Sequence, residues 1–203
     1  MAHKRSSSSQ PALDTLRERI DRIDAQILTL LNRRARLAQR IGDTKGKTGT
    51  VYIPSRERAV LARLAELNTG PLPDESVQTI YHEIISASRA LEASLRVAYL
   101  GPEASYAHMA SKEQFGSKAE FVPVETIPQI FSTVENGQVD YGVVPVENSS
   151  QGSVALTLDL FIETNLHIIA ERSLAIRHCL LSRSTKRERI QRVLAHPQSL
   201  AQC

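Results

Sequence analysis

The sequence predicts two domains of different fold class: an all-α domain over residues 12–95 and an α/β domain over residues 96–203. In the first, apolar side chains recur every three or four residues over long stretches, which is the spacing of an amphipathic helix. In the second, short apolar runs alternate with helical segments, which indicates βαβ units on a parallel sheet. Residues 1–11 are basic and Ser-rich and lack the apolar stretch of a secretory signal, so we expect a disordered leader there.

Three helices are expected in the all-α domain. The second should start near Ser55, and the third at Asp74, whose carboxylate can cap it. The first helix is the longest, and its apolar seam continues for four heptads. Two shorter helices cannot bury that seam within one chain, so two chains are expected to intertwine. The seam contains Leu13, Leu16, Ile20, Ile23, Ile27, Leu30, Leu37 and Ile41.

Short segments of alternating type fill the α/β domain. Strands are expected at residues 97–101, 120–124, 141–146, 167–171 and 174–182, and helices at residues 102–116, 126–137 and 154–164. Gly116 and Gly137 should end the first two of these helices, because glycine readily adopts the left-handed conformation found there. Parallel sheets bind ligands at the carboxyl ends of their strands. The polar run from Glu147 to Ser150 follows the third strand and is therefore a candidate site, although a capped loop would also explain it.

Charge and composition restrict the class of function. The formal net charge is +3, and the excess lies in residues 1–95, which hold 15 Lys and Arg against 11 Asp and Glu. That half lacks an aromatic pattern for stacking on nucleic acid, so it suits a small anionic ligand such as a dicarboxylate, or is simply an Arg-rich helix surface. No apolar run approaches the roughly 20 residues of a membrane span. The two cysteines fit no disulfide framework or metal-ligand spacing, which indicates a protein of the reducing cytoplasm.

Arg34 interrupts the apolar seam of the first helix, where the spacing calls for an apolar side chain. A buried guanidinium needs an anion nearby. Lys45 lies on the same face, about 16 Å further along, so the two cations could close around a small dianion. Alternatively, Arg34 pairs with an acidic group of another helix. Polar groups also recur at core-facing positions of the other two helices, namely Arg56, Glu57, Ser88 and Glu92.

These residues form motifs that resemble a known family. The segments "LDTLRERIDRIDAQILTLLNRRARLAQRIGDTK", "RERAVLARL" and "IYHEIISASRALE" resemble the all-helical AroQ-type chorismate mutases over residues 12–95. The resemblance implies an intertwined homodimer that converts chorismate to prephenate without a cofactor. It also implies roles for individual residues: Arg34 and Arg17 of the partner subunit hold the substrate carboxylates, Lys45 and Glu92 address the ether oxygen, Glu57 binds the ring hydroxyl, and Arg56 and Ser88 position the ligand.

Three sequence motifs of the second domain resemble those of prephenate dehydratases. They are "GPEASYAHMA", "VPVENSSQGSV" and "HPQSLAQC". Their place behind a chorismate mutase is that of the bifunctional bacterial P-proteins of phenylalanine biosynthesis. The resemblance implies a fold similar to type II periplasmic binding proteins, and conversion of prephenate to phenylpyruvate, carbon dioxide and water. The substrate cleft would be lined by Glu147, Asn148, Ser149, Ser150 and Gln202, with Ser105, His196 and Gln198 nearby.

The sequence lacks two features of that second family. It contains no Thr-Arg-Asp or Thr-Arg-Phe motif, which carries the proposed acid, and no regulatory ACT domain. We therefore expect residues 96–203 to be the N-terminal part of a dehydratase domain, C-terminally truncated and inactive in this chain. Two alternatives remain. Residues 96–203 could be a ligand-binding or dimer-supporting module without turnover, and the helical half could be a structural dimerisation bundle, which polar residues on its core faces disfavour.

Overall fold

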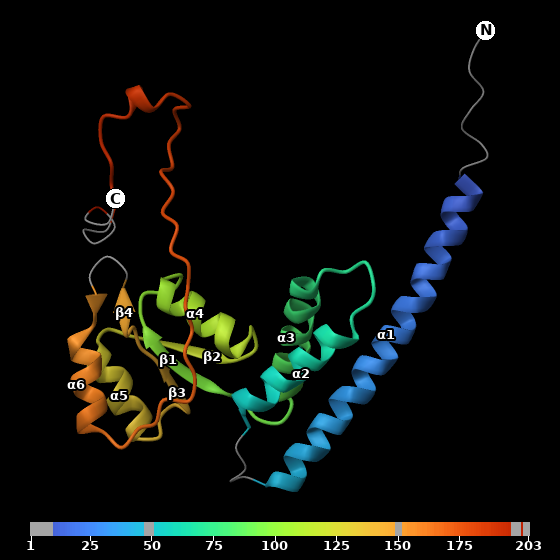
Figure 1. Cartoon of the computed structure of the whole chain (residues 1–203), viewed down its shortest axis with the longest axis horizontal. Coiled ribbons are helices and arrows are strands. Elements are labelled where there is room, and N and C mark those ends of the chain that lie inside the picture. The colour runs from blue at the N-terminus through green and yellow to red at the C-terminus, as the bar shows by residue number, and fades with distance from the viewer. Residues whose placement is uncertain (1–9, 47–50, 149–151, 196–199, 201–203) are drawn as a thin grey trace. The chain divides into compact units, whose positions relative to one another are not determined.

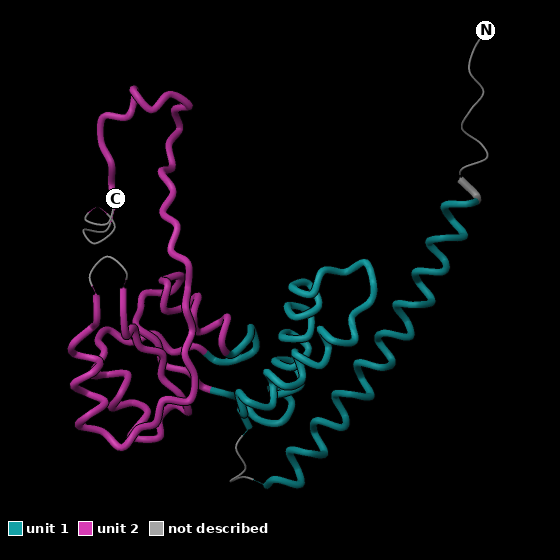
Figure 2. The backbone as a smooth tube through the Cα atoms, in the orientation of Figure 1, with its two compact units in different colours: residues 1–95, 115–120 teal, residues 96–114, 121–203 magenta. Residues whose placement is uncertain are grey.

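A computed structural model describes residues 10–46, 51–148, 152–195 and 200 of the chain. The chain divides into two units, drawn in teal and magenta in Figure 2. Unit 1 comprises residues 1–95 and 115–120, and unit 2 comprises residues 96–114 and 121–203. Residues 115–120, which come after the first strand in the sequence, thus belong to the helical unit.

Unit 1 is built from the three expected helices. They are α1 (Gln10–Lys45), α2 (Pro54–Leu67) and α3 (Asp74–Ala90), and α3 packs against both of the others (Figure 1). Helix α1 begins at Gln10, two residues inside the segment expected to be a leader, and residues 1–9 lie outside the described residues. None of the described helices is both long and apolar enough to cross a membrane.

The expected cap of α3 is wrong. The N-cap residue is Pro73, and Asp74 is the first residue of the helix. The Asp74 carboxylate instead accepts a hydrogen bond of 2.6 Å from Asn68 Nδ2, which also donates to the carbonyl of Leu72 at 2.8 Å. Asp74 therefore helps to close the loop between α2 and α3 rather than capping the helix with its side chain.

The apolar seam of α1 is exposed within a single chain. Every described residue from 12 to 30 is solvent-exposed, and the seam side chains are exposed by about half. Helix α1 continues toward its N-terminus past the region where it meets α3 (Figure 1). The expectation that two shorter helices cannot bury this seam is confirmed for one chain.

Unit 2 contains a three-stranded sheet of order β2-β1-β3. The strands are β1 (Arg96–Leu100), β2 (Glu120–Val124) and β3 (Tyr141–Val143), and β1 pairs with β3 in parallel with Val97 opposite Tyr141. The third strand is shorter than expected and is half-buried rather than buried, because it lies at the edge of this sheet. The predicted parallel pairing is confirmed for β1 and β3.

Successive side chains of β1 face different helices. Ala98 packs with Ile130 of α5 (Ile127–Glu135) and with Val139 in the core of the unit. Tyr99, the next residue, stacks on His108 of α4 (Tyr106–Phe115) with ring centroids 4.7 Å apart. Strand residues alternate between the two sides of a sheet, so α4 and α5 cover opposite faces of β1.

Local sequence signals set the ends of these helices. Thr126 and Gln129 form a capping box at the start of α5. Gly116 follows α4 with φ +76°, and Gly137 follows α5 with φ +65°. Both glycines were predicted to end their helices, and both predictions are confirmed.

The strands expected at residues 167–171 and 174–182 are wrong. After α6 (Ala155–Glu163), the described residues to 195 contain only a 3₁₀ turn, Arg187–Arg189. Side chains hold part of this segment instead: Tyr106 Oη and His178 Nδ1 are 3.2 Å apart, and Arg172 donates to the carbonyl of Glu113 at 2.7 Å. A strand requires a neighbouring backbone, and no described strand pairs with residues 167–182.

Candidate active site

Arg34 is the centre of the candidate site in unit 1. It is partly buried, and its Nη1 donates a hydrogen bond of 2.6 Å to Ser88 Oγ across the α1–α3 interface. Ser88 Oγ in turn donates to the carbonyl of Ile84 at 2.7 Å. Among the described residues Arg34 forms no ion pair, so its predicted alternative partner, an acid of another helix, is not seen in one chain. The charge of Arg34 still acts on an acid of another helix, because it lowers the pKa of Glu57 of α2.

Glu57 of α2 forms a partly buried ion pair that the sequence did not predict. Its Oε1 lies 2.5 Å from Arg89 Nη1, and the two side chains are only 16% and 5% exposed. Burial raises the pKa of Glu57 above its usual value, while the charges of Arg89 and Arg34 lower it in part. A signal for Arg89 was present, because it lies four residues after Ile85 and thus on the same buried face of α3.

Glu92 follows α3 and lies against α1 at Gly42. A Cβ atom added to Gly42 would lie 3.1 Å from Glu92 Cγ, so glycine permits the close approach. Glu92 lines a cavity of about 450 Å³. The other lining residues are Arg36, Gln39, Arg40, Gly42, Asp43 and Leu91. Of the predicted site residues that are described, only Glu92 lines this cavity.

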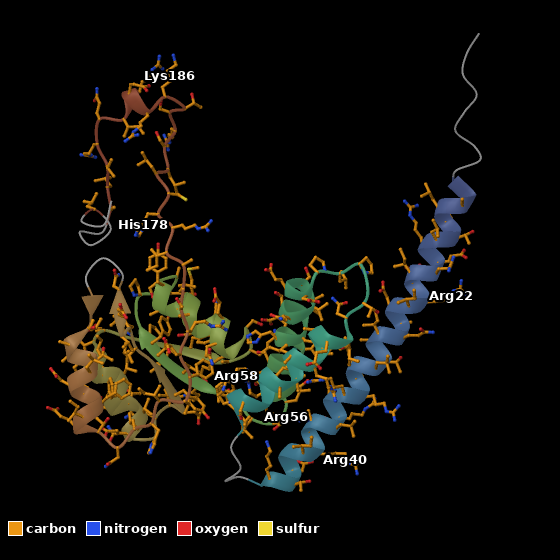
Figure 3. All side chains as sticks on the ribbon, in the orientation of Figure 1. Arg22, Arg40, Arg56, Arg58, His178 and Lys186 are labelled. Atoms are coloured by element: carbon orange, nitrogen blue, oxygen red, sulfur yellow. The ribbon has the colours of Figure 1, made fainter. Side chains whose placement is uncertain are left out.

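The remaining predicted residues of unit 1 are exposed. Arg17 forms an ion pair of 3.2 Å with Asp14 one turn away on α1. Lys45 is the last residue of α1, and Arg56 lies exposed in the first turn of α2 (Figure 3). The structure therefore brings Arg34 and Ser88 into direct contact. It pairs Glu57 with Arg89, the residue after Ser88 in α3. Within one chain it does not bring Arg17 to these residues.

The predicted residues of unit 2 are only partly described. Glu147 and Asn148 form the short strand β4, which pairs with β5 (Gly152–Ser153) shortly after β3. Ser105 joins the start of α4 to the end of β1, because its Oγ accepts from the amide of His108 at 3.3 Å and donates to the carbonyl of Leu100 at 3.1 Å. The predictions for Ser149, Ser150, His196, Gln198 and Gln202 lie outside the described residues. The described residues contain no group of three or more potential metal ligands.

Comparison with known families matches both parts of the chain. The family description "Prephenate dehydratase" covers residues 97–203, which is just over half of the chain. The chain belongs to the prephenate dehydratase family. Residues 16–93 of this prephenate dehydratase family member match a second family, "Chorismate mutase type II". Both resemblances predicted from the sequence motifs are therefore confirmed, as is the order of an all-α region followed by an α/β region.

Curated relatives carry both names. The bifunctional chorismate mutase/prephenate dehydratase of Aquifex aeolicus is 45% identical over 196 residues, which cover 94% of this chain and 54% of that protein. The protein of the same name from Neisseria gonorrhoeae is 48% identical over 188 residues, which cover 92% of this chain and 52% of that protein. The chain thus spans about half the length of the curated relatives it matches. The solved chorismate mutase (form II) of Thermus thermophilus is 41% identical, with a TM-score of 0.39, over 40% of this chain and 93% of that chain.

Proposed function

We propose that residues 12–95 form a chorismate mutase domain that converts chorismate to prephenate. The observation that carries the proposal is Arg34, a partly buried cation whose described partner is the neutral hydroxyl of Ser88. A guanidinium in this position matches a substrate carboxylate, since its planar fork binds such a group with two donors. The names of the relatives and the type II mutase match support the same activity.

The reaction makes few chemical demands on the protein. It is unimolecular, so catalysis consists of holding a compact substrate conformer and stabilising the charge that develops on the ether oxygen. Arg34 and Ser88 supply the anchoring side of this task. Lys45 and Glu92 are proposed to address the ether oxygen, Glu57 the ring hydroxyl, and Arg56 the orientation of the bound ligand.

A homodimer is part of the proposal for two reasons. The seam of α1 leaves apolar side chains exposed by about half, including Ile23 and Ile27. Arg17 lies 17 residues before Arg34 on the same helix, about 25 Å away, so it cannot reach the same small ligand from the same chain. Intertwining of two copies would cover the seam and deliver Arg17 of the partner subunit to the site.

The activity is tested by following the loss of chorismate with purified chain. Arg34→Ala is expected to lower kcat/KM by about 100- to 1,000-fold, the cost of removing a preorganised charged donor. Arg63→Ala is the matched control, because Arg63 is an exposed arginine of α2. Equal turnover by the wild type and Arg34→Ala would overturn the assignment.

Mixing variants tests the shared site. Arg17→Ala and Arg34→Ala chains are each expected to be inactive, but a refolded equal mixture contains heterodimers with one intact site. About a quarter of the wild-type activity should return if half of the dimers are mixed. Arg34→Ala mixed with Lys45→Ala is the control, since both residues come from the same chain and no intact site forms. Equal recovery in the two mixtures would contradict a contribution of Arg17 across the dimer.

For residues 96–203 we propose a part of a prephenate dehydratase domain that binds prephenate near Glu147, Asn148, Ser149, Ser150 and Gln202. Ser105, His196 and Gln198 are proposed to lie nearby. The expectation that this chain does not dehydrate prephenate stays a prediction, and phenylpyruvate formation by the 203-residue chain would contradict it. A cytoplasmic location also stays a prediction.

A further inference from the structure

Arg89 is the most completely buried charged side chain described in unit 1, at 5% exposed. Its guanidinium has three partners within that unit. Nη1 donates to Glu57 Oε1 at 2.5 Å, Nη2 donates to the carbonyl of Phe115, and the carbon atom Cζ lies 4.8 Å from the centre of the Tyr52 ring. These contacts join Glu57 of α2 and Arg89 of α3 to Tyr52, which precedes α2, and to Phe115, the last residue of α4.

The planar guanidinium connects the positions of its partners. The donors of an arginine point in fixed directions, unlike the rotatable ammonium of a lysine. Because one nitrogen is held by the carbonyl of Phe115, the other nitrogen has little freedom, and the orientation of the Glu57 carboxylate follows from it. A carboxylate accepts several hydrogen bonds, so Glu57 can receive Arg89 on Oε1 and a ligand hydroxyl on Oε2.

The turn at residues 115–118 is itself fastened to α3. Ser86 Oγ donates to the carbonyl of Phe115 at 3.5 Å, and the amide of Lys118 donates to Ser86 Oγ at 3.2 Å. Ser117 Oγ donates to Glu83 at 2.5 Å. This turn lies outside the segment that matches the chorismate mutase family and inside the segment that matches prephenate dehydratases.

We propose that Arg89 is a positioning residue for Glu57 in the mutase site and that the turn at residues 115–118 holds Arg89 in place. The inference rests on the proposed mutase function. Arg89 acts through Glu57 rather than on the substrate, because its side chain is almost fully buried. Residues from the dehydratase match thus complete the mutase site.

A double-mutant cycle in the full chain tests the first part. Arg89→Met is expected to lower kcat/KM for chorismate by about 10- to 100-fold, the usual effect of a misplaced catalytic group. Arg89→Lys keeps the charge and should lose less, and it replaces Arg89→Met in the cycle if the latter fails to fold. In a Glu57→Ala background, either Arg89 change should add less than about a twofold further loss. A purely structural Arg89 would add its full loss in both backgrounds, and that result would overturn the proposal.

Two glycines provide a matched test of the turn. Gly116 and Gly137 each follow a helix with positive φ, so alanine is strained at both positions. An added Cβ at Gly116 would overlap the side chain of Ser86, whereas none of the described atoms lies within 4 Å of one at Gly137. Gly116→Ala is expected to lower mutase kcat/KM by about tenfold per folded chain, and Gly137→Ala to leave it unchanged. Equal effects of the two changes would overturn the role of the turn.

The outcomes separate this inference from the function on which it rests. Absence of chorismate turnover, or turnover insensitive to Arg34→Ala, would overturn both. Turnover that falls with Arg34→Ala and Glu57→Ala, but is unaffected by Arg89→Lys and Arg89→Met, would overturn the positioning role alone. Circular dichroism of each variant at the assay temperature measures the folded fraction used to normalise the rates.

Discussion

Replacement of Ile23 by Asp is expected to separate the two copies of the proposed homodimer and to abolish the proposed mutase turnover. Ile23 lies in the middle of the exposed apolar seam of α1 and is 53% exposed. A dimer would bury this side chain against the partner subunit, and an aspartate there would leave a carboxylate in an apolar interface. The same change would keep Arg17 of the partner subunit away from the site.

The seam offers enough apolar surface for a stable interface. Its eight side chains are exposed between 45% and 62%. Burying the exposed half of each side chain is worth about 1 kcal/mol, so the eight side chains of each of two copies give about 16 kcal/mol. That sum meets the association cost of about 4–15 kcal/mol. An unpaired polar group in the interface costs about 3 kcal/mol per copy, so about 6 kcal/mol per dimer weakens association by roughly 10,000-fold.

Sedimentation velocity at micromolar concentration measures the dimer, and chorismate loss measures the activity in the same sample. Ala25→Asp is the matched control, because it introduces the same charge on the opposite side of α1, where residue 25 is exposed. A dimeric Ile23→Asp variant would refute the seam as the interface. A monomeric variant with full turnover would refute the need for Arg17 of the partner subunit.

Three further predictions concern single contacts. Gly42→Ala should push Glu92 away from α1 and lower mutase kcat/KM by about tenfold, measured with chorismate at saturating and limiting concentration. Ile130→Ala should lower the free energy of unfolding in urea by about 2–5 kcal/mol, because Ile130 is 1% exposed in the core of unit 2, whereas Ile162→Ala, at 84% exposed, should change it little. Burial raises the pKa of Glu57, so the folded state binds this proton more readily than the unfolded state does. The stability of the wild type relative to Glu57→Gln should therefore fall as the pH rises above 4.5 through the folded pKa, and a constant difference in urea midpoints from about pH 4 to pH 7 would contradict this.

Much of the fold could be predicted from local signals. The three helices of unit 1 follow from apolar spacing, and the ends of α4 and α5 follow from Gly116 and Gly137. The prediction of strands at residues 167–171 and 174–182 was wrong for a physical reason. Apolar and β-branched residues favour an extended chain, but a strand exists only where a neighbouring backbone accepts its hydrogen bonds.

The candidate site was predictable in part. Arg34 stood out because it interrupts an apolar seam, and Ser88 because it recurs on the facing side of another helix. Their direct hydrogen bond of 2.6 Å depends on how α1 and α3 pack, which no spacing encodes. The spacing of Arg89 from Ile85 indicates that it lies on the buried face of α3, but it gives no indication of a carbonyl partner 26 residues further along the chain.

The sequence by itself determined the helical and α/β halves, the exposed seam of α1 and the family motifs, because periodicity, capping and glycine conformation act over a few residues. Only the tertiary structure decided that Glu57 pairs with Arg89 and that the turn at residues 115–118 belongs to the helical unit. Those contacts join segments far apart in the chain. They depend on the burial of a charge, whose cost can be judged only when every partner around it is known.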